Sequence, residues 1–134
     1  MKAKRFTKET IRDIGTVDRK FPAIEIGDTI AVSQVIKEGG KERIQVFEGD
    51  VIAKHNHGIS STFTVRKISA NAVSVERIFP YYSPLIESIK FVNKGKTRRA
   101  KLYYLRKRVG KTASVEELVL TREQRDQKSA TAQE

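Results

Sequence analysis

The sequence predicts a mainly β protein, a small closed or half-closed barrel, with short helical extensions at both ends. Short runs of alternating apolar and polar residues fill the middle of the chain, and turn residues separate them roughly every 8–12 positions. A barrel is favoured because closure removes exposed strand edges. At 134 residues the chain has the length of one domain, and two halves would each struggle to bury a core.

The first expected strands are Thr29–Ile36 and Ile44–Phe47, joined by a turn at Glu38-Gly39-Gly40. Glu48-Gly49-Asp50 interrupts the second run, which continues in Val51-Ile52 as if through a glycine bulge. A third strand is therefore expected to begin there.

His55-Asn56-His57-Gly58 has the composition of a turn, and the β-formers of Thr62–Val65 follow it. Ser69-Ala70-Asn71 reverses the chain again, with Asn71 as the natural residue for a positive φ. The next strand, over 73–79, must stop near Pro80 because proline cannot donate to a strand ladder.

Ile86–Val92 and Lys101–Leu105 complete a set of about six expected strands. The chain ends look helical instead. Ile11 and Ile14 lie one helical turn apart, and the capping box of residues 114–117 precedes Leu118 and Val119. We therefore expect a partly helical basic extension over 1–20, the barrel over 21–113, and a C-terminal helix with a polar tail over 114–134.

The net charge of +11 predicts an anionic partner, and its distribution points to nucleic acid. Residues 21–93 hold eight cations and eight acids, whereas residues 94–111 hold nine cations and no acid. These nine cannot neutralise one another, and a polyphosphate backbone is the commonest partner for such a run. The alternative is a solvated cationic strand.

The candidate RNA-binding residues follow from this distribution. The first group is the basic run itself: Lys94, Lys96, Arg98, Arg99, Lys101, Arg106, Lys107, Arg108 and Lys111. Arg66, Lys67 and Arg77 could extend the positive surface over neighbouring strands, with surface ion pairing an equal contender, and Lys41 and Arg43 follow a glycine turn that could reach RNA. If 101–105 is a strand, Tyr103 and Tyr104 face opposite ways, so one could pack on a base or sugar.

Other function classes have little support in the sequence. The chain has no cysteine, which excludes thiolate metal sites and cysteine nucleophiles, and His55 and His57 lack the further ligands that zinc needs. No apolar run reaches membrane-spanning length, and no phosphate-binding glycine loop or nucleophile elbow is present. We expect a cytoplasmic protein with no catalytic residue, no cofactor or metal, no membrane partner and no small-molecule substrate.

Several ungapped stretches resemble a known family. FEGDVIAKHNHGISSTFTVRKIS (Phe47–Ser69), VERIFPYYSPLIESI (Val75–Ile89) and KGKTRRAKLYYLRKRVGKTA (Lys94–Ala113) are similar to the nineteenth protein of the bacterial large ribosomal subunit. With the shorter matches at 27–29 and 38–45, the resemblance covers about Phe21–Ala113 in the family's order and spacing.

The resemblance implies an SH3-like barrel that binds large-subunit ribosomal RNA near the subunit interface, without cofactor or turnover. It also implies contacts with small-subunit ribosomal RNA, bridges between the subunits, and neighbouring large-subunit ribosomal proteins. Carried onto this chain, it points to the cations of 98–111 first and to Arg66, Lys67 and Arg77 second. His55-Asn56-His57 stands where relatives usually carry arginine, which lowers the fixed charge expected of that loop.

Two rival functions are compatible with the same barrel. The first is a free RNA-binding or ribosome-assembly factor, although such factors commonly carry a second domain and none is evident here. The second is an RNA-processing enzyme that uses His55 and His57.

Overall fold

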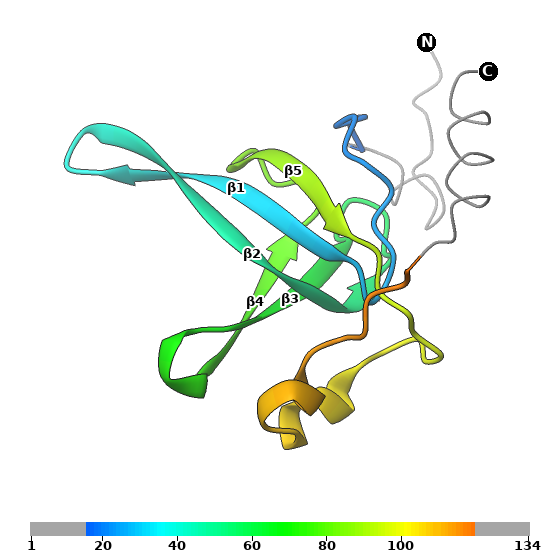
Figure 1. Cartoon of the computed structure of the whole chain (residues 1–134). Coiled ribbons are helices and arrows are strands. Elements are labelled where there is room, and N and C mark those ends of the chain that lie inside the picture. The colour runs from blue at the N-terminus through cyan, green and yellow to red at the C-terminus, as the bar shows by residue number, and fades with distance from the viewer. Residues whose placement is uncertain (1–15, 120–134) are drawn as a thin grey trace, which may run out of the picture.

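The computed structural model describes residues 16–119 and consists of one antiparallel sheet with short 3-10 helices (Figure 1). The sheet has the strand order β4-β3-β2-β1-β5. The strands are β1 (Thr29–Glu38), β2 (Lys41–His55), β3 (Thr62–Ile68), β4 (Ser74–Pro80) and β5 (Ile86–Asn93). The 3-10 helices are η1 (Ala70–Ala72), η2 (Tyr103–Lys107) and η3 (Gly110–Ala113). The prediction of a mainly β protein is confirmed.

The main core lies on one face of this sheet, which we call the inner face. Alternation places Ile30, Val32 and Phe63 there, each essentially without solvent exposure. Phe79 from edge strand β4 and Ile86 from edge strand β5 belong to the same cluster. The two edges are not paired by hydrogen bonds in the described ladder, yet they share one core, so the sheet coils around its own apolar face.

The β1–β2 hairpin extends beyond the rest of the sheet (Figure 1). Its pairing runs without a break from Thr29 opposite Asp50 to Glu38 opposite Lys41. Gly39 and Gly40 form the turn with φ of +55° and +79°, which confirms the turn predicted there. The hairpin therefore carries the end of β1 and the start of β2 well away from the core.

Gly49 does not interrupt β2, so the predicted bulge and the separate third strand at Val51-Ile52 are wrong. Gly49 pairs regularly with Ile30, and the irregularity in β2 falls between Val51 and Ala53. A Cβ atom at Gly49 would lie 2.3 Å from the carbonyl oxygen of Arg66. The glycine is needed because the β3 backbone approaches closely, and not because the strand breaks.

The strand predicted at Lys101–Leu105 is also wrong, because this stretch leads into η2. Leu102 and Leu105, three residues apart, lie on the same side of a 3-10 turn and are both buried. They pack on Ile52 and Ala53 of β2, and the Leu102 amide donates a 2.8 Å hydrogen bond to the Ile52 carbonyl. We call the face of the sheet opposite the main core the outer face. Because η2 lies on this outer face, this part of β2 is covered on both sides.

No helix begins at the capping box of residues 114–117, so the C-terminal helix predicted from Ser114 is wrong as far as Val119. The backbone there bonds to another segment instead: the Lys96 amide donates to the Glu116 carbonyl, and the Leu118 amide donates to the Lys94 carbonyl, both at 2.8 Å. These groups are consequently not available for a helical turn. The predicted N-terminal helical turn at Ile11 and Ile14 and the polar tail beyond Val119 lie outside the described residues.

Two smaller predictions about the β3–β4 hairpin are confirmed. Asn71 has a positive φ of 64° in the turn, and β4 ends at Pro80. Within residues 16–119, no helix has the length and apolar character needed to cross a bilayer.

Candidate nucleic-acid interface

The basic segment, which we define as Lys94–Lys111, follows β5 and leads into η2 and the start of η3 (Figure 1). Its start is fixed by tight backbone contact, because a Cβ atom at Gly95 would lie 2.0 Å from the Gly27 carbonyl oxygen. Its middle is fixed by Leu102 and Leu105, which anchor η2 on β2. The segment is therefore held at its start by the loop that precedes β1 and at its middle by β2.

Seven of the nine cations of this segment form no salt bridge with any acid among residues 16–119. All seven are solvent-exposed. Their charge is consequently available to an external anion. They are Lys96, Arg98, Arg99, Lys101, Lys107, Arg108 and Lys111.

The other two cations, Lys94 and Arg106, are paired within the protein. Lys94 Nζ lies 2.7 Å from Glu25 Oε2, and this hydrogen bond raises the pKa of Lys94. Arg106 donates to both carboxylate oxygens of Glu76, which raises the pKa of Arg106. No local pattern in the sequence distinguished these two residues from the other seven.

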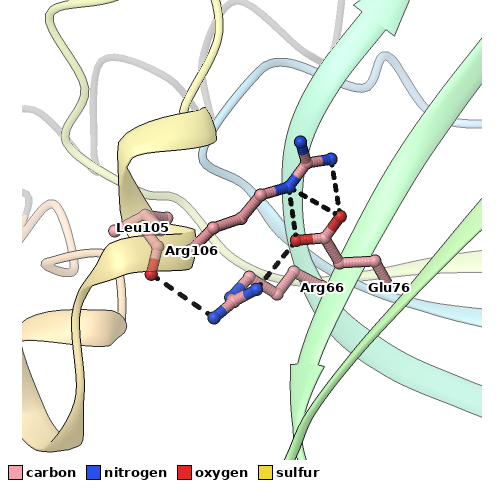
Figure 2. A network of polar contacts seen from close by, with 4 residues as sticks. All are labelled: Arg66, Glu76, Leu105 and Arg106. Atoms are coloured by element: carbon pink, nitrogen blue, oxygen red, sulfur yellow. Dashed lines mark hydrogen bonds and ion pairs between the residues drawn. The ribbon is translucent and has the colours of Figure 1, made fainter.

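Glu76 of β4 also binds Arg66 of β3, so two guanidinium groups meet at one carboxylate (Figure 2). Arg66 Nη1 lies 2.8 Å from Glu76 Oε1, and Arg106 Nη2 lies 2.7 Å from Glu76 Oε2. The hydrogen bonds from Arg106 and, secondarily, from Arg66 hold the pKa of Glu76 below its ordinary value, although burial opposes them. We call Arg66, Glu76 and Arg106 the outer-face triad.

Arg66 is a buried structural residue, which corrects its interpretation as part of an exposed positive surface. Its side chain is only 6% exposed, and its Nη2 donates a 3.3 Å hydrogen bond to the Leu105 carbonyl in η2. Arg66 pairs in register with Glu76, an arrangement that places both side chains on the outer face.

Lys67 and Arg77 lie on the inner face, which separates them from the basic segment. Arg77 pairs with the core residue Val65, and its guanidinium carbon lies 5.4 Å from the centre of the Phe79 ring. Lys67 Nζ lies 5.9 Å from the centre of the Phe47 ring. They do not continue the outer-face surface as the sequence suggested.

Lys41 and Arg43 lie at the tip of the β1–β2 hairpin. Arg43 Nε is 3.1 Å from Glu38 Oε2, with both side chains mostly exposed. Lys41 is exposed at the start of β2. Neither belongs to the surface formed by the basic segment, and RNA binding by either stays a prediction.

The two tyrosines of η2 hold cations of the basic segment in place. The guanidinium carbons of Arg99 and Arg108 lie 5.1 and 4.7 Å from the centre of the Tyr104 ring. Lys101 and Arg106 make the corresponding contacts with Tyr103, at 5.9 and 4.6 Å. Cation–π attraction of this kind orders long side chains.

One tyrosine ring packs toward the core and the other faces the solvent, although the two residues lie in a 3-10 helix and not in a strand. Tyr104 is half-buried against the cluster that includes Leu102 and Leu105, whereas Tyr103 is 38% exposed. Packing of either ring against a base or sugar stays a prediction.

The cations of the basic segment surround a concave surface. An open hollow of about 600 Å³ is lined by Lys96, Arg98, Arg99, Arg108 and Lys111, together with Glu116. A second hollow of about 430 Å³ shares Arg108 and Lys111 and reaches the outer-face triad. A concave surface with an excess of positive charge concentrates the field and attracts anions.

The histidine loop has the geometry of an ordinary polar turn. The His57 amide donates to Ser61 Oγ at 3.0 Å, and His57 Nδ1 lies 3.3 Å from the Asn56 carbonyl oxygen. His55 and His57 are both exposed. Within the described part of the chain, no group of three or more histidine, aspartate or glutamate side chains is arranged to hold a metal ion.

Comparison with known proteins gives consistent matches. The family described as Ribosomal protein L19 matches residues 4–118. The large ribosomal subunit protein bL19 of Clostridium botulinum (strain Hall) is 58% identical over 99 residues, which cover 74% of this chain and 86% of the relative. The protein of the same name from Clostridium novyi is 60% identical over 92 residues, covering 69% and 78%. That from Clostridium beijerinckii is 58% identical over 99 residues, covering 74% and 84%.

Proposed function

This chain belongs to the ribosomal protein L19 family, and from that premise we propose that it is a structural constituent of the large ribosomal subunit in the bacterial cytoplasm. It binds ribosomal RNA through the basic segment and carries out no catalysis. Relatives that bear the name of a large-subunit protein at 58–60% identity support the assignment to this subunit.

The observation that carries the RNA-binding proposal is the set of seven exposed cations without an acidic partner in residues 16–119. A cation already paired within the protein gains little from a phosphate, because it must first give up its partner. An unpaired cation gains the interaction in full and also releases counterions from the RNA. The basic segment is therefore the surface at which RNA binding is most favourable.

Phosphate contacts supply the affinity in this proposal, and shape supplies the selectivity. The major groove of duplex RNA is too deep and narrow for side chains to read, so proteins bind duplex RNA mostly through its shape, phosphates and 2′-hydroxyl groups. The hollow lined by Lys96, Arg98 and Lys111 presents cations on a concave surface suited to a projecting backbone. Tyr103, the more exposed of the two rings, is our candidate for packing on a sugar or a base.

The sheet serves as the scaffold, and we propose that it forms an SH3-like barrel over residues 21–113. The shared core of edge strands β4 and β5 supports this architecture. In the same proposal residues 1–20 form a basic extension and the chain from Ser114 a terminal appendage. Contacts with neighbouring large-subunit proteins and with small-subunit RNA, which would bridge the two subunits, rest on family membership alone.

The RNA-binding proposal is tested by salt dependence. We compare the unmodified protein with Arg98→Ala/Lys107→Ala, which removes two unpaired cations of the basic segment. The matched control is Lys37→Ala/Lys90→Ala, which removes the same charge from the β1–β2 hairpin and β5. With large-subunit ribosomal RNA as ligand, the slope of log affinity against log salt should become shallower by about 1.4–1.8 for the first pair and much less for the control. Equal changes would mean that the RNA contact lies elsewhere.

Membership of the subunit is tested by sedimentation. A structural constituent should remain with large subunits through a high-salt wash, whereas a free assembly factor should be released. Quantitative recovery in the released fraction would favour the assembly-factor alternative.

A further inference from the structure

The outer-face triad joins the sheet to the segment that carries the unpaired cations (Figure 2). Arg66 and Glu76 come from the paired strands β3 and β4, and Arg106 comes from η2. Four hydrogen bonds of 2.7–3.0 Å converge on the Glu76 carboxylate, three of them from Arg106. A single acid on the sheet thus fixes one turn of the basic segment.

The triad also reaches the backbone of η2. Arg66 Nη2 donates to the Leu105 carbonyl, which also accepts the Arg108 amide at the end of the helix. Glu76 holds the guanidinium group of Arg66 in the position from which this bond is made. Loss of the carboxylate would therefore release Arg106 directly and loosen the Leu105 contact indirectly.

A 3-10 helix of five residues needs such support. Short helices fix several backbone dihedrals for few hydrogen bonds, so they are marginal without tertiary contacts. Leu105 supplies apolar contact on one side, and the outer-face triad supplies polar contact beside it. The exposed cations of η2 and its flanks depend on both for their placement.

We infer that Glu76 is a positioning residue for RNA binding: it holds η2 against the sheet so that the unpaired cations of the basic segment are in place before RNA arrives. The inference rests on the proposed function and deepens it. An acid inside a basic surface normally opposes a polyanion. Here its charge is already balanced by two guanidinium groups, so its repulsion is small and its effect on order is dominant.

The inference predicts a result opposite to that expected from net charge. Glu76→Gln leaves 27 cations against 15 acids, which raises the net charge from +11 to +12. Net charge alone predicts tighter RNA binding. If Glu76 is a positioning residue, Glu76→Gln should bind RNA about 3- to 10-fold more weakly. The cationic side chains are ordered before binding in the unmodified protein, whereas in the variant they must be ordered during binding. The sign of the change separates the two explanations.

The experiment measures affinity for large-subunit ribosomal RNA at fixed salt and amide hydrogen exchange in the protein alone. The control is Glu87→Gln, which makes the same charge change at an exposed residue on β5, the opposite edge of the sheet from β4. For Glu76→Gln we expect weaker binding and faster exchange in η2, with β1 and β2 unchanged. Affinity equal to or above that of Glu87→Gln would overturn the inference.

Faster amide hydrogen exchange in β1 would show that Glu76→Gln disrupts the sheet. A second variant is used for that case. Glu76→Asp keeps the net charge but withdraws the carboxylate by one methylene. Weaker RNA binding with an intact sheet supports positioning, and unchanged binding overturns it. If the unmodified protein does not bind this RNA in a salt-dependent way, the proposed function fails; if it does, and the Glu76 variants match it, only the positioning role fails.

Discussion

The sheet and the basic segment are held together in different ways. The three central strands of the sheet, β3, β2 and β1, are each paired with a strand on both sides, and residues from all five strands contribute to one core. The basic segment has two 3-10 helices and attaches to the sheet through a few identifiable side chains, chiefly Leu102, Leu105 and Arg106. Stability is thus distributed over the sheet and concentrated at a few residues in the segment.

The two regions also differ in how far their charges are balanced by ion pairs. Residues 21–93, which include the sheet, hold eight cations and eight acids, and several of these form pairs, including Lys37 with Glu42 and Arg43 with Glu38. The basic segment contains no acid, and within residues 16–119 it forms salt bridges with two acids from elsewhere, Glu25 and Glu76. Those two act near its attachment points, which leaves the rest of its charge available to a partner. Rigidity and unbalanced charge are therefore supplied by different residues.

The largest expected effects come from apolar truncation in each region. Ile30→Ala in the main core and Leu105→Ala in η2 should each lower the free energy of unfolding by about 2–5 kcal/mol. Amide exchange should distinguish them. Ile30→Ala should speed exchange throughout the sheet, whereas Leu105→Ala should act first on residues 94–111. Identical exchange patterns would contradict the separation of the two regions.

Gly95→Ala tests the attachment at the start of the basic segment. The added Cβ atom would meet the Gly27 carbonyl oxygen at 2.0 Å, so we expect a loss of about 1–3 kcal/mol as the backbone moves apart. Gly40→Ala is the comparison, since that position has a positive φ of 79° but no atom nearby. Thermal unfolding of both variants compares the loss of stability caused by the close contact at Gly95 with the loss caused by backbone strain alone at Gly40. A neutral Gly95→Ala would show that this contact is loose.

The lowered pKa of Glu76 predicts that the outer-face triad weakens in acid. A carboxylate with a depressed pKa in the folded state stabilises the fold above its ordinary value of 4.5, and this contribution disappears as the pH falls through the folded pKa. The unmodified protein should exceed Glu76→Gln in stability by about 1–3 kcal/mol at neutral pH, with the gap closing below about pH 4. Urea unfolding across pH measures the gap. A difference that grows toward acid pH would contradict the charged network.

The smallest effect is expected at the hairpin tip. Arg43→Ala breaks the ion pair with Glu38, in which both side chains are more than half exposed. Exposed pairs contribute about 0–1 kcal/mol, so stability should change little, and raised salt should reduce the difference further. A loss as large as that of Leu105→Ala would show that the hairpin tip is structurally important.

The sequence predicted the strands well where apolar and polar residues alternate, and it failed where burial is two-sided. Residues 29–36 and 62–65 alternate, and both are strands. Residues 101–105 are also rich in β-formers, yet Leu102 and Leu105 lie three residues apart on one side of a 3-10 turn and pack on β2. The wrong prediction of a bulge at Gly49 has a similar cause, because the close approach of the β3 backbone is not visible in the local sequence.

The candidate site was predicted in composition but not in detail. The density of cations identified the basic segment, and seven of its nine cations are exposed without an acidic partner among residues 16–119. Glu76 was missed, although a signal existed: Arg66 and Glu76 lie equally far from Asn71, the predicted turn residue, so the hairpin register pairs them. The contribution of Arg106 depends on how η2 packs, which no local pattern encodes.

The most direct test of the central claim is ultraviolet crosslinking of ribosomal RNA to protein in intact large subunits, with the crosslinked peptides identified by mass spectrometry. The claim is that RNA is held by the basic segment and not by residues 21–93, in which cations and acids are equal in number. It predicts crosslinks concentrated in peptides from residues 94–111, Tyr103 among the modified positions. Crosslinks confined to the β1–β2 hairpin, with none in 94–111, would contradict it.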